Sequence, residues 1–191
     1  MEKLLFFKGM IEKYTEGGFL RKLFSWLAKA IGIVALIYGI YKFVDQWSEM
    51  GEGAEAILSR VVYQILWLLL VYLVMHFWWM KGAILAKQKD TDYILIPTAV
   101  HYVRAVGETI AAYSIIISLA YTFMILMQNS TYFTVPDIMM LIQINTESAF
   151  LWAMTVLVNG IVVGILTLGA YYLAAEILLV LLEIARNTRK K

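Results

Sequence analysis

Three long stretches of this sequence contain no charged residue, and a fourth apolar stretch carries charges only near its ends. The uncharged stretches are 61–80, 109–127 and 148–175, and the fourth runs over 23–44. A helix needs about 20 apolar residues to cross a hydrocarbon core about 30 Å thick. The sequence therefore predicts an all-α, polytopic membrane protein with four transmembrane helices.

The expected organisation is a single membrane domain over 1–191. The predicted spans run over about 23–44, 61–80, 105–127 and 148–172. They lie between an N-terminal amphipathic interfacial helix over 1–18 and a helical tail over 173–191, which we expect on the cytoplasmic side.

Composition supports a membrane protein and restricts its chemistry. Hydrophobic residues make up 62% and charged residues 16%, whereas soluble domains average about 45–50% and about 25%. Cysteine is absent, which excludes disulfides, thiolate ligands and cysteine nucleophiles. The net charge of +2 gives no indication of a nucleic-acid partner. The expected partners are the lipid bilayer and either other membrane subunits or copies of the chain itself.

The charges between the spans predict the orientation. Basic residues precede the first span, separate the second from the third and follow the fourth: Lys3, Lys8, Lys13, Arg21, Lys22, Lys81, Lys87, Lys89, Arg104, Arg186, Arg189, Lys190 and Lys191. The other two connections contain mainly acidic residues: Asp45, Glu49, Glu52, Glu55, Asp137 and Glu147. Basic residues accumulate on the cytoplasmic side. We therefore expect a multi-pass protein of a bacterial or archaeal cell membrane with both termini in the cytoplasm.

Two segments outside the spans are also apolar. Leu4, Phe7, Ile11 and Tyr14 recur at helical spacing within 1–18, which predicts an amphipathic helix. Such a helix can lie on the inner leaflet, which we favour, or dock on a partner.

The second apolar segment is 136–142, in the connection before the last span. It is too apolar for a free loop and too short to cross the bilayer. It is therefore expected to form a short interfacial or re-entrant helix.

Small residues recur on one face of three spans, and small residues let membrane helices approach closely. The expected packing residues are Gly32, Ala35, Gly39, Ala111, Ser114, Ser118, Ala153, Gly160 and Gly164. The span over 61–80 has no glycine, alanine or serine. This pattern predicts a tight cluster of the first, third and fourth spans, with the bulky second span outside it.

Ionisable residues inside a membrane are functional candidates. His101, Arg104 and Glu108 share one face of the third helix. They could form a structural Arg104–Glu108 ion pair, which we favour, or a proton or cation relay. Asn159 is the most central polar residue of the last span. It could hold helices together by hydrogen bonding, which we favour, or line a pore.

The sequence contains only two histidines, His76 and His101, too few for a metal site without other ligands. It has no phosphate-binding glycine loop, nucleophile elbow or zinc-binding helix motif. We therefore expect no metal and no cofactor.

These patterns favour a non-enzymatic integral membrane subunit that scaffolds or anchors a larger membrane assembly, or that forms a homo-oligomer. The alternative is a small ion channel or transporter with a polar path near Asn159 and Glu108. An enzyme acting on lipid through His101, Arg104 and Glu108 is a weaker hypothesis, because three side chains on one helix face make a poor substrate cleft.

Overall fold

The computed structural model describes residues 18–47, 53–88, 95–130, 135–136, 140–142, 144 and 146–189. These residues contain helices and irregular segments but no strand. The helices are α2 (Gly18–Trp47), α3 (Ala54–Lys87), α4 (Leu95–Gln128) and α5 (Ala149–Arg189). All four are long and apolar enough to cross a membrane. The predicted fold class, all-helical with four membrane-spanning helices, is confirmed.

The amphipathic helix expected over 1–18 lies outside the described residues, except for Gly18. That residue already begins α2, which is apolar enough to cross a membrane. The described part of the chain therefore lends no support to an amphipathic segment before the first span.

Each helix is longer than the span predicted within it. α3 and α4 have 34 residues each and α5 has 41, so at 1.5 Å per residue they extend about 50 Å and about 60 Å. A hydrocarbon core is only about 30 Å thick. The helices therefore continue well past the apolar segments, and α5 runs without a break to Arg189.

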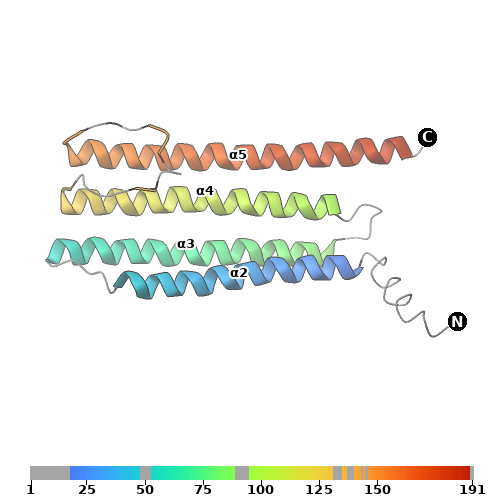
Figure 1. Ribbon diagram of the computed structural model, residues 1–191, viewed down its shortest axis with the longest axis horizontal. Helices are drawn as coiled ribbons and strands as arrows, with labels where there is room; N and C mark the ends of the chain where they lie inside the picture. Colours follow the sequence, from blue (N-terminus) through green and yellow to red (C-terminus); the bar gives the residue numbers. More distant parts are fainter. Residues whose placement is uncertain are drawn as a thin grey trace.

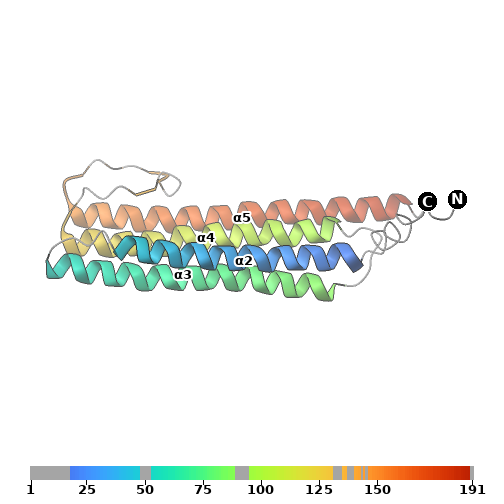
Figure 2. The same cartoon turned by 60° about the horizontal axis from the view of Figure 1, so that its bottom comes forward.

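The helices pack in the order of the chain. α2 lies along α3, α3 along α4, and α4 along α5, while α2 barely contacts α4. The result is an open, curved row of antiparallel helices (Figures 1 and 2). α2 and α4 begin at one end of the row, where α3 and α5 end. We call this the basic end because it carries Lys22, Lys81 and Arg104, and we call the opposite end the far end.

The position of α3 differs from the sequence prediction. We expected the bulky second span outside a cluster of the other three, but α3 lies between α2 and α4. The reason is that small residues on one helix receive large residues of its neighbour. A Cβ added at Gly39 would collide with Val71, and one added at Gly32 would lie 3.1 Å from the Met75 carbonyl. Bulky side chains on α3 thus fill the notches of α2.

Small residues of α4 and α5 make the second close contact. A Cβ at Gly160 would collide with the Ser118 side chain, and one at Gly164 would lie 2.8 Å from Ile115. Ser114 and Ala153 are fully buried.

The remaining predicted packing residues are Ala111, which is also buried, and Ala35. Ala35 is only partly buried. It lines an apolar groove of about 270 Å³ with residues of α3 and α4.

Gly160→Ala is expected to destabilise the protein, because its Cβ would meet Ser118 and would lie 2.7 Å from the Ser114 carbonyl. Overpacking of this kind costs about 1–3 kcal/mol. The matched control is Gly169→Ala on the same helix, where the added Cβ has no atom within 4 Å. Helix propensity alone would make both substitutions stabilising. Thermal unfolding in mild detergent should therefore lower the midpoint for Gly160→Ala only, and equal midpoints would contradict the close α4–α5 contact.

Candidate functional site

A polar cluster at the basic end joins three helices. Lys81 Nζ of α3 donates to Glu108 Oε1 of α4 at 2.7 Å, and the Tyr172 hydroxyl of α5 donates to the same oxygen at 2.7 Å. The side chains of Lys81 and Glu108 are only 13% and 16% exposed. The positive charge of Lys81 balances the Glu108 carboxylate, and the Tyr172 hydroxyl adds a second short hydrogen bond to it.

Arg104 and His101 lie on the same helix as Glu108 but have different environments. The Arg104 guanidinium lies over the Tyr172 ring, 5.1 Å from its centroid, and the Arg104 Nε atom has no hydrogen-bond partner. His101 is partly buried and lies one turn before Arg104. Glu108 pairs with Lys81 of the neighbouring helix rather than with Arg104. In the sequence, Lys81 indicates only the orientation of the chain, and Tyr172 carries no signal that separates it from other interfacial tyrosines.

Further hydrogen bonds tie α2 to this end. Ser25 Oγ donates to the Gly82 carbonyl at 2.7 Å, and the Tyr102 hydroxyl donates to the Phe24 carbonyl at 2.6 Å. These bonds connect α2 with α3 and with α4. The basic end is therefore held by polar contacts that involve all four helices.

Asn159 of α5 holds a segment that precedes its own helix. Its Oδ1 accepts from the backbone N–H groups of Leu141 and Ile142 at 3.0 and 2.9 Å. Its Nδ2 donates to the Ile142 carbonyl at 2.8 Å and to the Thr155 carbonyl at 3.0 Å. The amide thus clamps the backbone of 141–142, and we call this arrangement the Asn159 clamp.

The clamp lies deep along the helix. Asn159 is ten residues after Ala149, the first residue of α5, which places it about 15 Å from the far end of that helix. Irregular backbone at such depth needs its polar groups satisfied by protein. The clamp satisfies three of them.

Residues that precede the clamped backbone pack on the helices. Val135 is buried in the core cluster, and Met140 packs against it, whereas the side chains of Leu141 and Ile142 are more than half exposed. A short interfacial or re-entrant helix was expected over 136–142. Residues 140–142 fold back along α5 as bends rather than as helix, and 137–139 lie outside the described residues.

The hydroxyl groups between α4 and α5 mostly bond within their own helices. Ser118 donates to the Ile115 carbonyl and Thr155 to the Leu151 carbonyl. Thr122 donates both to its own helix and across to the Ala153 carbonyl at 3.2 Å. This seam is closed by the small-residue contacts described above.

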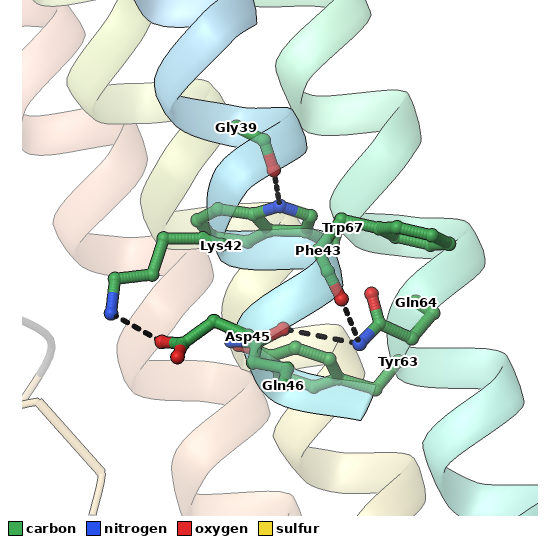
Figure 3. A network of polar contacts seen from close by, with 8 residues as sticks. All are labelled: Gly39, Lys42, Phe43, Asp45, Gln46, Tyr63, Gln64 and Trp67. Carbon is green, nitrogen blue, oxygen red and sulfur yellow. Dashed lines mark hydrogen bonds and ion pairs between the residues drawn. The ribbon is translucent and has the colours of Figure 1, made fainter. Parts of the chain in front are cut away.

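A third set of polar contacts lies between α2 and α3, in the half of the molecule nearer the far end (Figure 3). Gln64 Nε2 donates to Gln46 Oε1 at 3.3 Å and to the Phe43 carbonyl at 3.4 Å. Trp67 Nε1 donates to the Gly39 carbonyl at 2.9 Å. These side chains lie between the two helices, as Figure 3 shows, and link their backbones.

Metal ligands do not gather in the described part of the chain, where no group of three or more His, Cys, Asp or Glu side chains could hold an ion. His76 stacks on Tyr72 of the same helix, with ring centroids 5.8 Å apart. No family model, curated protein or solved structure matches this chain.

The Lys81–Glu108 pair should show strong energetic coupling. Glu108→Gln leaves Lys81 charged and largely buried, which costs about 3–5 kcal/mol. Adding Lys81→Met removes the unpaired charge and should recover part of that loss. The free energy of unfolding in detergent, measured for both single variants and the double variant, gives the coupling.

The control is the i,i+3 pair Lys42–Asp45, whose side chains are 35% and 42% exposed. Its double-mutant cycle should show little or no coupling, as for other exposed pairs. Additive effects of the Lys81 and Glu108 substitutions on the free energy of unfolding would contradict an energetically coupled pair at the basic end.

Asn159→Leu should release the clamped segment, because two part-buried N–H groups lose their acceptor, at a cost of up to about 1–3 kcal/mol each. The chain has no native cysteine, so Leu141→Cys provides a single label site. In membranes, the rate of labelling by a membrane-impermeant maleimide should rise on the order of tenfold or more, since about 1.4 kcal/mol is a factor of ten.

Thr155→Val is the matched control, because the Thr155 hydroxyl bonds only to the Leu151 carbonyl of its own helix. It should leave the labelling rate unchanged. An unchanged rate in Asn159→Leu would show that the segment is held by packing alone.

Proposed function

We propose that the chain is a non-enzymatic membrane subunit that scaffolds or anchors a larger membrane assembly, either with other subunits or with copies of itself. The observation that carries the proposal is how the candidate polar side chains are used. Glu108 bonds to two other helices, the Asn159 clamp holds backbone of the same chain, and Gln64 links α3 to α2. Polar groups that hold the helices together in this way favour a rigid structural subunit.

The open row of helices supports the same proposal. α5 packs extensively only against α4, although it is the longest helix, and α2 occupies the other edge. Two edge helices leave lateral surface for neighbours in the membrane. With the basic end on the cytoplasmic side, as the distribution of lysine and arginine favours, the last turns of α5 would project into the cytoplasm.

A channel or transporter has less support. Its polar path would pass near Asn159 and Glu108, but the first is occupied by four hydrogen bonds and the second by an ion pair. The α4–α5 seam between their levels is tightly packed at Gly160 and Gly164.

Native mass spectrometry of the protein, released directly from its own membrane into mild detergent, tests the proposal. We expect either a defined homo-oligomer or co-release with other polypeptides. A lone monomer would overturn the scaffold proposal. Ion flux through vesicles that contain the purified chain, reduced by Glu108→Gln, would support the channel instead.

A further inference from the structure

An exposed apolar stripe runs along α5 on the side away from α4. It consists of residues at alternating steps of four and three: Leu166, Ala170, Leu173, Ile177, Val180 and Ile184. The five large side chains are each 53–62% exposed. Ala175 and Leu182, on the opposite side of the helix, are buried. We call these six residues the α5 stripe.

Much of the α5 stripe lies beyond the level of the polar cluster. Tyr171 packs against Gly107, and Tyr172 bonds to Glu108, so this level marks where charged side chains first occur between the helices. From there α5 continues to Arg189, roughly 25 Å further. Lipid can cover apolar side chains that precede this level along α5. Contact with water is unfavourable for a contiguous apolar patch that follows it. Ile177, Val180 and Ile184 therefore form an apolar patch that a protein partner would bury.

The geometry points to a second copy of this chain as that partner, paired in parallel along the α5 stripe. Steps of four and three define the 3.5-residue repeat of a coiled coil. In that repeat the first apolar position is taken by Ala170, Ile177 and Ile184, and the second by Leu166, Leu173 and Val180. Isoleucine in the first position with leucine in the second favours parallel two-stranded pairing.

Charge placement agrees with parallel rather than antiparallel pairing. Glu176 and Glu183 flank the α5 stripe on the same side of the helix. In a parallel pair each would face a position five residues on in the partner copy, occupied by Leu181 and Thr188. In an antiparallel pair the glutamates of the two copies would face each other, and like charges at this distance repel.

Membrane insertion favours the same arrangement. Copies inserted with one topology present their α5 helices in parallel, and confinement to the bilayer raises their effective concentration. This compensates for a repeat that covers fewer than the three to four heptads used as evidence for a free coiled coil. The inference rests on the proposed function, since it identifies the partner of a scaffold subunit as a second copy.

Disulfide crosslinking in native membranes tests the inference, because the chain has no cysteine of its own. Single variants Leu173→Cys, Ile177→Cys and Ile184→Cys should each form a disulfide-linked dimer on mild oxidation. Leu179→Cys is the matched control, since Leu179 is also apolar and exposed but lies away from the seam. We expect the dimer yield at the three stripe positions to exceed the control at least fivefold. Same-residue crosslinks at all three positions arise only from a parallel pair.

A second measurement separates this inference from the scaffold proposal. Native mass spectrometry should show a dimer for wild type and for Leu179→Asp, and its loss for Ile177→Asp, which would put two like charges against each other at the seam. Equal crosslinking at stripe and control positions would overturn the pairing. Co-release of the chain with other polypeptides and without a second copy would also overturn it, but would leave the scaffold proposal standing. A lone monomer would overturn both.

Discussion

Inside a bilayer no water is present to bond to polar groups, so each must find its partner within the protein. This constraint explains the three polar sites. Glu108 meets Lys81 and Tyr172 at the basic end, Gln64 meets the backbone of α2 nearer the far end, and the Asn159 clamp completes a segment that is not helical. Each site joins elements that are distant in the sequence. Together they hold a row of helices whose apolar surfaces alone give little reason to associate in lipid.

The packing follows from the sizes of facing side chains. α3 lacks small residues in its apolar core, and this is what lets it lie between two neighbours. Val71 fits against Gly39 of α2, while Trp78 donates a hydrogen bond to Thr109 of α4. On the other side of the row, Gly160 and Gly164 bring α5 onto α4. An open row results because the small residues of α2 are used on α3 and those of α5 are used on α4.

The two faces of α5 connect the fold with the proposed role. α5 uses one face on α4 and leaves the α5 stripe exposed on the other. Lipid can cover such a face within the bilayer, whereas an apolar face that meets water is typical of a protein interface. A parallel second copy would cover this face with its own apolar residues and would not place like charges opposite each other. The cohesion of each chain and its lateral pairing would then come from opposite faces of one helix.

The sequence by itself determined the number and approximate position of the helices, because a run of about 20 apolar residues has few alternatives to crossing a membrane. It also identified Glu108 and Asn159 as the polar residues to follow, since such side chains are rare at that depth. Only the tertiary structure decided their partners. Lys81 lies 27 residues from Glu108 along the chain, and Leu141 contacts Asn159 through its backbone, which carries no sequence signal. The neighbours of α3 were likewise not predictable, because a small-residue stripe shows that a helix can be approached closely but not by which helix.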